Sequence, residues 1–455
     1  MRCVVGIDLG STTTKAVMLD EEGVVVGRGI TNSRSNYEVA CAVARDEAHT
    51  AARFAFVERA AQALDGPGAE LARQKLDELH GAFRLELFLA ELEALRVTMH
   101  ASLSRSFVHR ERRAELAPAI GAIVDGIRER APADFLPGAA RKSDFFRDLA
   151  GAAFVAGAEA RAREGGPPFE QLVGVFDRAI LDVETRRLSR DIPDLLRRAS
   201  ARVWQRDEGA GLPLRRALDR VVESASAETL EEIVFVGTGY GRQTLPFPKE
   251  AVRSEILCHG RGAHRVCPGT RTVLDIGGQD TKAIQVDAGG VVTSFQMNDR
   301  CAAGCGRYLG YIADELSLGL HELGPLALQS TRTVKVCSTC TVFASAELRE
   351  RLALGQKRED ILAGLHRAIM VRAMSLLARS GGVFDEFTFT GGVCNNPMAV
   401  KVLRELVAEN YGAGVTINTD PNSIYMGALG AALFALDDLR AGVNLVTPAF
   451  AREAS

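Results

Sequence analysis

The sequence predicts an α/β protein of two or more lobes that carries a large, mainly helical insertion. Its 455 residues are 47% hydrophobic, which is enough to bury a sizeable core and form more than one lobe. One motif occurs twice, in the order Asp, apolar residue, Gly, small residue and then Thr-Lys, as Asp8-Leu-Gly-Ser-Thr-Thr-Thr-Lys15 and Asp275-Ile-Gly-Gly-Gln-Asp-Thr-Lys282. Between the two copies, residues 37–229 are rich in Ala, Arg, Leu and Glu, a composition that favours helices.

Composition and charge exclude several classes of protein. The formal net charge of -3 leaves no broad basic surface, so nucleic acid is not expected as a partner. The first residues, MRCVVGIDLG, lead directly into a strand, and no uninterrupted apolar stretch is long enough to span a bilayer. We therefore expect a cytoplasmic protein without a membrane partner. Nine cysteines in such a chain are more typical of thiols or metal ligands than of disulfides.

The N-terminal residues predict three strands in a meander with a polar first turn. Apolar residues from Val4 to Leu9 predict a strand buried on both faces, and two more strands are expected at Ala16 to Asp20 and Val24 to Arg28. Asp8 lies near the end of the first strand, and a glycine and hydroxyl residues follow it. A Ser/Thr-rich hairpin without a ligand is one interpretation. Because the motif occurs a second time in the chain, we favour the interpretation that both copies are ligand-binding turns.

The second copy predicts a turn suited to phosphate. After Asp275, the pair Gly277-Gly278 permits a tight reversal that bulkier residues would resist. A backbone without side chains at these two positions can lie against phosphate oxygens, and Asp275 and Asp280 are available to hold the waters of a magnesium ion. Ligand-free Asp-Gly-Gly hairpins are common, so the motif alone does not distinguish the two possibilities.

The order of these segments predicts how the chain is divided. A short strand at Ile233 to Val236 resumes the fold after the insertion, and the glycine-rich loop Gly237 to Arg242 suits a hinge or a ligand loop. Cys258 and His259 form too isolated a pair to predict a metal site. We expect an N-terminal lobe from residues 1–36 and 230–271, the helical insertion at 37–229, a C-terminal lobe with cysteine loops at 272–436, and a tail at 437–455.

Four cysteines in the C-terminal lobe have metal-type spacing, as Cys301-x3-Cys305 and Cys337-x2-Cys340. A helix is expected to begin near Cys301, and a strand at Val334 to Thr341 is expected to lead into a helix at Phe343 to Leu352. Cys301 and Cys340 would then lie near helix N-termini, where the helix dipole lowers the pKa of a thiol. A zinc site within one chain is the competing interpretation, and four unconnected thiols are a third.

A further glycine pair follows a strand near the C-terminus. The expected strand at Glu386 to Thr390 leads to Gly391, Gly392 and Asn395 and then to a helix. A strand, two glycines and a helix N-terminus suit the close approach of a nucleoside or a phosphate. The small residues from Met426 to Leu433 predict a final helix with a slim face that permits tight packing.

Taken together, the two Asp motifs, Thr390-Gly-Gly392 and the final small-residue helix resemble the acetate and sugar kinase, Hsp70 and actin superfamily, which has two ribonuclease-H-like lobes with ATP between them. The cysteine motifs narrow this resemblance to the BadF/BadG/BcrA/BcrD-type ATPases of benzoyl-CoA reductases and 2-hydroxyacyl-CoA dehydratase activators. The motifs concerned are Gly237-Thr-Gly-Tyr-Gly-Arg242, Asn298-Asp-Arg-Cys301-Ala-Ala-Gly304, Ser338-Thr-Cys340-Thr-Val-Phe343 and Thr390-Gly-Gly-Val393. The match covers about residues 1–35 and 231–436, and the insertion resembles the long ATPase subunit of benzoyl-CoA reductase.

The resemblance implies roles for named residues. Asp8 and Asp275 would hold magnesium, and Gln279 or Asp280 would position the attacking water. A [4Fe-4S] cluster would be shared across a subunit interface, with Cys301 and Cys340 as this chain's two ligands. Cys305 and Cys337 depart from the compact activators and leave that ligand choice open. The remaining residues implied to contact ATP are Gly10, Ser11, Thr12, Thr13, Lys15, Gly277, Gly278, Gly391, Gly392 and Asn395.

The resemblance also implies an activity. The protein would be the ATP-hydrolysing subunit of benzoyl-CoA reductase, in anaerobic aromatic degradation. It would pass electrons from ferredoxin to ring-reducing subunits through a cluster shared with a second, homologous ATPase subunit. Such a donor needs a potential near the low end of the iron-sulfur range, about -700 mV. The alternatives are an ATP-dependent activator of a 2-hydroxyacyl-CoA dehydratase and, in another class, a small-molecule kinase with structural zinc.

Overall fold

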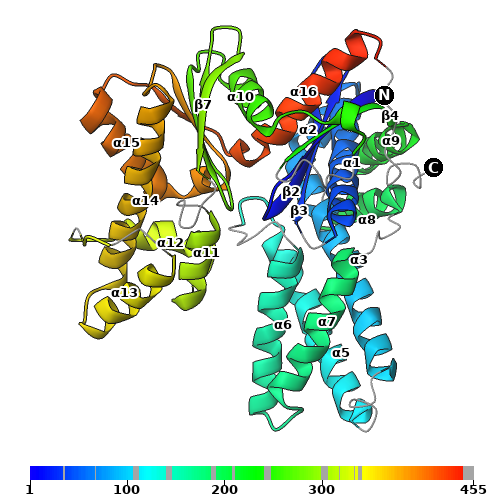
Figure 1. Cartoon of the computed structure of the whole chain (residues 1–455). Helices are drawn as coiled ribbons and strands as arrows, with labels where there is room; N and C mark the ends of the chain where they lie inside the picture. The colour runs from blue at the N-terminus through cyan, green and yellow to red at the C-terminus, as the bar shows by residue number, and fades with distance from the viewer. Residues whose placement is uncertain are drawn as a thin grey trace. The chain divides into compact units, whose positions relative to one another are not determined.

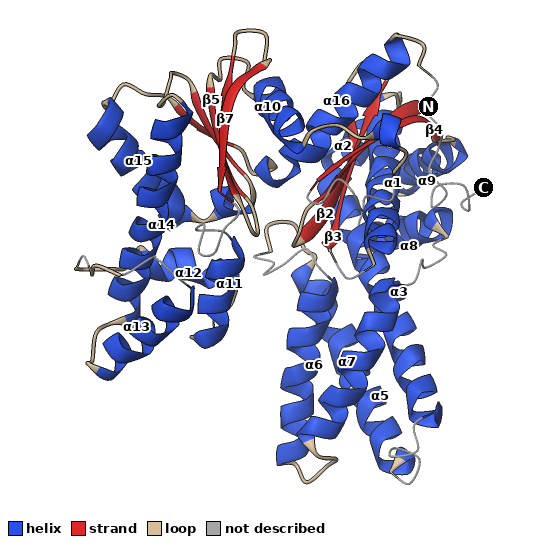
Figure 2. Cartoon of the chain, viewed as in Figure 1, coloured by secondary structure: helices blue, strands red, loops and turns tan. Residues whose placement is uncertain are grey.

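The computed structural model of the chain describes residues 1–33, 36–66, 68–105, 112–139, 146–185, 191–206, 211–239, 247–298, 306–316, 318–332, 334–336 and 341–443. The chain forms two compact units (Figure 1). Unit 1 comprises Met1–His49 and Leu230–Ser455, and unit 2 comprises Thr50–Thr229. The strands lie in unit 1, whereas the described part of unit 2 contains helices only (Figure 2).

The first sheet of unit 1 has the strand order β3-β2-β1-β4. Strands β1 (Arg2–Leu9), β2 (Thr13–Asp20) and β3 (Val25–Asn32) form the predicted antiparallel meander. Strand β4 (Glu231–Gly239) pairs with β1 in parallel, although all of unit 2 separates the two strands in the sequence. The insertion therefore interrupts one sheet between its third and fourth strands.

The second sheet repeats this arrangement and adds a fifth strand, in the order β7-β6-β5-β8-β9. Here β5 pairs with β6 antiparallel and with β8 in parallel, as β1 pairs with β2 and β4. The fold is thus the predicted actin, Hsp70 and sugar-kinase type, with two ribonuclease-H-like lobes. The strands are β5 (Thr272–Ile276), β6 (Thr281–Val286), β7 (Val292–Asn298), β8 (Phe387–Thr390) and β9 (Ile417–Thr419).

Helices of unit 1 cover the two sheets. They supply most of the buried apolar side chains in the core of the second lobe, which also includes Phe387 and Phe389 of β8. They are α10 (Glu255–Val266), α11 (Gly306–Glu315), α12 (Leu320–Ala327), α13 (Thr341–Ala353), α14 (Arg358–Ser380), α15 (Pro397–Tyr411) and α16 (Met426–Arg440), with short 3-10 turns η1 (Lys249–Ala251), η2 (Gly392–Asn395) and η3 (Ser423–Tyr425).

The strand expected at Val334 to Thr341 is wrong where the structure describes it, because Val334 to Val336 belong to no strand. The backbone of Val334 lies so close to Gly364 of α14 that a side chain at position 364 would overlap the Val334 carbonyl oxygen. Val336 packs against the core of the second lobe. Val334 and Val336 are therefore partly buried against a helix rather than paired with a neighbouring strand.

Helix α14 is, in the described part of the chain, the one helix long and apolar enough to cross a membrane by length and composition. Its most apolar 18-residue window is 67% buried inside the protein. Ile361, Leu365 and Leu377 are among the side chains that it contributes to the core of the second lobe. A helix at the centre of a folded lobe meets the same criterion, so we interpret α14 as a core helix.

Unit 2 is a set of helices with its own apolar core. That core includes Leu92 and Leu95 of α3, Ile120 of α5, Phe154 of α6 and Phe176 of α7. Helix α1 (Tyr37–Gln62) crosses the boundary between the units at Thr50. The other helices are α2 (Ala69–Gln74), α3 (Leu76–Arg105), α5 (Arg113–Asp134), α6 (Phe146–Arg163), α7 (Phe169–Thr185), α8 (Ile192–Arg206) and α9 (Leu212–Ala227).

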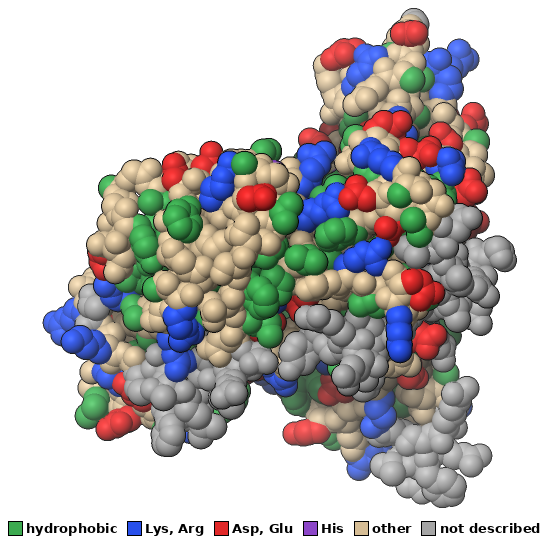
Figure 3. All heavy atoms as spheres, turned by 45° about the horizontal axis from the view of Figure 1, so that its top comes forward, with side chains coloured by type: hydrophobic (Ala, Val, Ile, Leu, Met, Phe, Trp, Pro, Cys, Tyr) green, Lys and Arg blue, Asp and Glu red, His purple; other side chains and the backbone are tan. Residues whose placement is uncertain are grey.

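The surface of the molecule carries both signs of charge. On the face drawn in Figure 3, lysine and arginine side chains are interspersed with aspartate and glutamate side chains rather than gathered by sign. That face therefore offers no broad single-sign surface.

Helices α10 and α16 pack in close contact, as the small residues of α16 predict. Cβ atoms at Gly430 of α16 and at Gly262 of α10 would overlap backbone atoms of the facing helix, at Cys258 and Met426 respectively. On its other side, α16 approaches Gly6 of β1 so closely that a side chain there would overlap the α16 backbone. These glycines let α16 pack closely between the first sheet and α10, which carries part of the candidate site.

We predict that Gly430→Ala lowers the free energy of unfolding by about 1–3 kcal/mol, because the added methyl group has no space between α10 and α16. Gly310→Ala is the matched control, since Gly310 lies within helix α11 of the same unit and a Cβ there meets nothing within 4 Å. We expect that control to be neutral or stabilising by up to about 1 kcal/mol. Urea unfolding of the two variants measures the difference, and equal effects would contradict the packing argument.

Candidate functional site

The duplicated motif places an aspartate opposite a lysine in each sheet. In the strand register, Asp8 of β1 faces Lys15 of β2, and Asp275 of β5 faces Lys282 of β6. The lysine Nζ lies 3.3 Å from the aspartate Oδ2 in both pairs. The repeat predicted from the sequence therefore corresponds to the same ion pair at the same position of two related sheets.

The two aspartates differ in what else they contact. Thr390 of β8 donates from Oγ1 to Oδ1 of Asp275 at 3.0 Å. Its counterpart Thr238 on β4, which pairs with Asp8, instead donates to the carbonyl oxygen of Arg253. Oδ1 of Asp8 is buried and has no hydrogen-bond partner in the described part of the chain. Asp8 thus keeps a free acceptor where Asp275 has none.

The first turn runs from Gly10 to Thr13, as predicted. Ser33 fixes its shape, because its Oγ donates to the carbonyl oxygen of Gly10 at 2.5 Å and its N–H donates to that of Thr12 at 2.8 Å. A Cβ at Gly10 would lie 2.7 Å from the carbonyl oxygen of Thr13. The turn therefore needs a glycine at this position, and Ser11, Thr12 and Thr13 remain at least partly exposed.

The second turn lies against the first. The N–H of Gly277 donates to the carbonyl oxygen of Asp280 at 3.0 Å and closes the turn. A side chain at Gly278 would overlap the Thr12 hydroxyl, so close approach by the first turn, rather than a left-handed backbone, requires this glycine. Gln279 is half-buried and Asp280 is buried. The structure thus brings the residues predicted for phosphate and for water together.

Two hydrogen bonds join the second turn to helix α11. The N–H of Gly306 donates to the carbonyl oxygen of Gly277 at 2.7 Å, and the N–H of Arg307 donates to that of Gly278 at 2.9 Å. Helix α11 begins at Gly306, directly after Cys305 in the sequence, and α13 begins at Thr341, directly after Cys340. The predicted cluster ligands themselves lie outside the described residues, namely Cys301, Cys305, Cys337 and Cys340.

Lys282 is the electrostatic centre of the site. Its Nζ lies 2.9 Å from Asp280 Oδ1, 3.0 Å from Glu255 Oε1 and 3.3 Å from Asp275 Oδ2, and its side chain is only 2% exposed. Burial alone would lower the pKa of Lys282, but the three carboxylates hold it well above the usual range. Burial would likewise raise the pKa of Asp275, but His259 and Lys282 hold it well below its usual value. Both groups are therefore charged at neutral pH.

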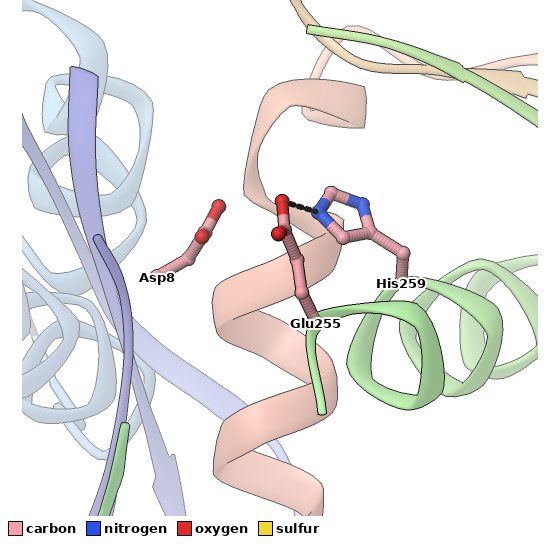
Figure 4. A group of neighbouring side chains, drawn as sticks. All are labelled: Asp8, Glu255 and His259. Carbon is pink, nitrogen blue, oxygen red and sulfur yellow. Dashed lines mark ion pairs between the residues drawn. The ribbon is translucent and has the colours of Figure 1, made fainter. Parts of the chain in front are cut away.

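Helix α10 adds two residues that the sequence analysis did not assign to the site, Glu255 and His259 (Figure 4). His259 Nδ1 lies 3.2 Å from Asp275 Oδ1, and Nε2 lies 3.9 Å from Glu255 Oε1. Neither ring nitrogen has a partner with hydrogen-bond geometry among the described residues, although the ring is only 5% exposed. Burial would lower the pKa of His259, but the neighbouring Asp275 raises it.

The sequence analysis predicted no metal site at Cys258 and His259. The structure places His259 in a group of possible metal ligands. One potential ligand atom from each of Asp8, Glu255 and His259 lies within 4.8 Å of the others. The available signal was the spacing Glu255-x3-His259, which puts both side chains on one face of a helix. Their proximity to Asp8 is a tertiary contact that spacing does not reveal.

The third predicted loop lies at the end of β8. Gly391 has a φ of 86°, which favours glycine, and a Cβ there would overlap the carbonyl oxygen of Ile276. Gly392 and Asn395 are exposed, as a nucleoside-binding role requires. The neighbouring Asn396 caps helix α15, because its Oδ1 accepts from the N–H of Met398 at 3.0 Å.

His366 of α14 holds Asn396 in place. Burial lowers the pKa of His366 to about 4, so the ring is neutral. Its Nδ1 donates to the carbonyl oxygen of Leu362 at 2.7 Å, and its Nε2 accepts from Asn396 Nδ2 at 2.9 Å. The neutral His366 ring, with its proton on Nδ1, therefore helps to fix the position of Asn396 in the loop after β8.

Chemically, the arrangement suits a nucleoside triphosphate with a divalent cation. Two glycine turns offer backbone that phosphate oxygens can approach, and Lys15 supplies a positive charge beside the first turn. The free Oδ1 of Asp8 is the kind of hard oxygen ligand that magnesium prefers.

Comparison with known proteins agrees with this chemistry. Residues 5–435 match the model of the BadF/BadG/BcrA/BcrD ATPase family. Over 220 residues the chain is 42% identical to the (R)-2-hydroxyglutaryl-CoA dehydratase activating ATPase of Acidaminococcus fermentans, covering 48% of this chain and 82% of that protein. Over 242 residues it is 40% identical to the activator of lactoyl-CoA dehydratase of Anaerotignum propionicum, covering 52% and 88%. Over 251 residues it is 32% identical to a benzoyl-CoA reductase subunit of Thauera aromatica, covering 54% and 86%.

We predict that Lys282→Met lowers the free energy of unfolding by about 3–5 kcal/mol, because it leaves buried carboxylates without their cation. Lys15→Met is the matched variant from the first sheet. Lys15 faces one carboxylate and is 12% exposed, so we expect a smaller loss. Chemical denaturation of both variants measures the difference. An equal or larger loss for Lys15→Met would contradict the central role of Lys282.

We predict that His366 makes stability depend on pH. Its pKa is about 4 in the folded protein and 6.5 in an unperturbed ring, so the unfolded state binds the proton first as the pH falls. The stability that the neutral ring contributes is therefore fully present above about pH 6.5. As the pH falls toward 4, the free energy of unfolding decreases by about 3 kcal/mol. His366→Gln does not titrate there, and unfolding curves of both proteins across this range measure the difference. Parallel pH dependences would show that the ring is not held neutral.

Proposed function

The chain belongs to the BadF/BadG/BcrA/BcrD ATPase family, and on that premise we propose that it is an ATP-dependent activator of a 2-hydroxyacyl-CoA dehydratase. In this role it would hydrolyse ATP to raise the reducing power of an electron that it passes to the dehydratase. The relatives named as dehydratase activators are 42% and 40% identical to it, whereas the benzoyl-CoA reductase subunit is 32% identical. The activator proposal therefore takes precedence over the reductase subunit that the sequence analysis favoured.

The observation that carries this proposal is the pair of hydrogen bonds between the glycine turn and the start of α11. Phosphate at Gly277 and Gly278 would act on the same backbone whose carbonyl oxygens accept from Gly306 and Arg307. In the sequence, Cys301 and Cys305 come directly before that helix. A change at the turn, such as loss of the terminal phosphate, would therefore act on the start of the helix that follows these cysteines.

The residues of the site divide the work of ATP hydrolysis. Asp8 would hold magnesium through its free Oδ1, whereas Asp275, whose two oxygens are engaged by Thr390, His259 and Lys282, would reach the ion only through its bound waters. Gln279 or Asp280 would position the attacking water, because phosphoryl transfer requires placement and charge neutralisation more than covalent chemistry. The two turns would contact phosphates, and the exposed Gly392 and Asn395, with Gly391, would line the nucleoside.

Cys301 and Cys340 are the proposed ligands of a [4Fe-4S] cluster. Their thiolates are the donor type that such clusters require, and two ligands per chain imply a second copy or a homologous chain that supplies the other two. When bound, the cluster would supply a one-electron donor of low potential. For one electron, each ~59 mV of added reducing power is a tenfold change in equilibrium, so several hundred millivolts require several kcal/mol of differential nucleotide binding.

The second candidate is the ATPase subunit of benzoyl-CoA reductase. It is supported by the 32% identity to the Thauera aromatica protein, a match that covers 54% of this chain, and by the resemblance of the insertion to the long ATPase subunit of benzoyl-CoA reductase. In both roles we propose ferredoxin as the electron source and a cytoplasmic location. Isolation from the native host distinguishes the two roles, because a reductase subunit remains in a stable complex with ring-reducing subunits and an activator dissociates.

We predict that protein purified without oxygen contains iron and sulfide, and that Cys301→Ser or Cys340→Ser removes most of the iron while ATP binding is retained. Cys267→Ser is the matched control, since Cys267 is half-buried and outside the cysteine motifs. Metal analysis and the visible absorbance of the cluster measure the effect. Full iron content in both motif variants would refute the ligand assignment, and zinc in place of iron would favour the small-molecule kinase.

A further inference from the structure

We propose that Asp8, Glu255 and His259 form a binding site for a divalent transition-metal ion. The ion would bind there in the absence of nucleotide, and Mn²⁺ is the ion used to test the site. The site is built from side chains of this chain alone, and it does not depend on the identity of the acyl-CoA partner. It shares Asp8 with the magnesium site proposed above and differs from it in having an imidazole nitrogen among its ligands.

The geometry of the three side chains supports a shared ion. They come from β1 and from one face of α10, and they point toward one another (Figure 4). One ligand atom of each lies within 4.8 Å of the other two. Nitrogen and oxygen ligands lie about 2.0–2.2 Å from a metal ion of this kind, which places ligand pairs roughly 3–4 Å apart. Small side-chain adjustments therefore suffice to bring all three into contact with one ion.

The cluster also contains buried polar atoms without a hydrogen bond to any described residue, namely Oδ1 of Asp8 and both ring nitrogens of His259. The contacts of the His259 ring are the ion-pair distances already given, 3.2 Å from Nδ1 to Asp275 and 3.9 Å from Nε2 to Glu255. Asp8 is 1% exposed and His259 is 5% exposed, so bulk water does not satisfy these atoms freely. Buried polar groups are normally paired, and unpaired ones in a native structure often indicate an absent ligand. An ion between Asp8 and His259 would satisfy one atom of each.

The charges of the surroundings favour a dication. Four carboxylates lie together here, on Asp8, Glu255, Asp275 and Asp280, and the two ammonium groups of Lys15 and Lys282 compensate two of them. Two carboxyl groups therefore have no ammonium partner of their own in a largely buried region, where burial raises the pKa of Glu255. A divalent cation with a neutral imidazole as one ligand would balance them, and a buried charge is stable only when balanced.

The backbone of α16 leaves room beside the cluster. A Cβ at Gly427 would lie 2.8 Å from Asp8 Oδ2 and 2.8 Å from His259 Nε2. Any larger residue at this position would therefore press on two of the three proposed ligands. The glycine keeps the space around them open on the side of α16.

The ligand set determines which metal to use. Magnesium prefers oxygen ligands and ideal octahedral geometry, whereas imidazole suits first-row transition metals. Mn²⁺ accepts both carboxylate and imidazole, and it binds thiolates weakly compared with zinc. It therefore reports on this site rather than on the cysteine loops.

The test is a titration of the full-length, metal-stripped, nucleotide-free protein with Mn²⁺, followed by electron paramagnetic resonance. We expect one tight ion per chain, with a pulsed-resonance coupling to an imidazole nitrogen. His259→Gln should weaken Mn²⁺ binding at least tenfold and remove the nitrogen coupling, while Mg²⁺ binding should change much less. His264→Gln is the matched control on the same helix, because its Nε2 contacts the carbonyl oxygen of Ala288 and lies outside the cluster.

Three results would overturn the proposal: no tight Mn²⁺ in the unsubstituted protein, a bound ion without nitrogen coupling, or equal binding in the His259 and His264 variants. If His259→Gln does not fold, Glu255→Gln serves as the second variant, and the nitrogen coupling of the unsubstituted protein still decides whether an imidazole is a ligand. Iron content and ATP hydrolysis are measured separately, so failure here leaves the proposed ATPase role intact.

Discussion

The turn at Gly277 and Gly278 is the constraint on which the rest of the site depends. Its backbone is closed by Asp280, approached by Thr12 of the other lobe, and bonded through its carbonyl oxygens to the first residues of α11. A turn held on three sides cannot change shape without moving at least one neighbour. The turn and the first residues of α11 are therefore linked by backbone rather than by flexible side chains.

The electrostatics of the site differ between two sheets with the same strand arrangement. Both sheets keep an aspartate paired with a lysine across a hairpin, but only Asp275 is enclosed by Thr390, His259 and Lys282. That enclosure makes Asp275 a fixed negative charge that positions its neighbours. Asp8 retains an unpaired oxygen and is the member of the pair available to an exogenous cation. The same strand arrangement thus holds one aspartate fully engaged and leaves the other with an unpaired oxygen.

Much of this arrangement could be predicted from residue order. The repeated Asp motif, the meander and the glycine pair after β8 depend on local patterns of strand and turn, and the duplicated fold followed from them. Three features depend on tertiary contacts and could not be predicted. Gly278 is required by Thr12 rather than by the tightness of its own turn. Glu255 and His259 enter the site because α10 packs against α16, and Val334 and Val336 are partly buried against α14 without forming a strand.

The central claim is that nucleotide at the glycine turn controls the reducing power of a metal centre held by the neighbouring cysteine loops. The most direct test is the midpoint potential of that centre in anaerobically prepared protein, measured once with ADP bound and once with a non-hydrolysable ATP analogue bound. The account predicts potentials that differ by at least ~59 mV, a tenfold change in the one-electron equilibrium. Identical potentials in the two states, with iron and nucleotide both shown to be bound, would contradict it.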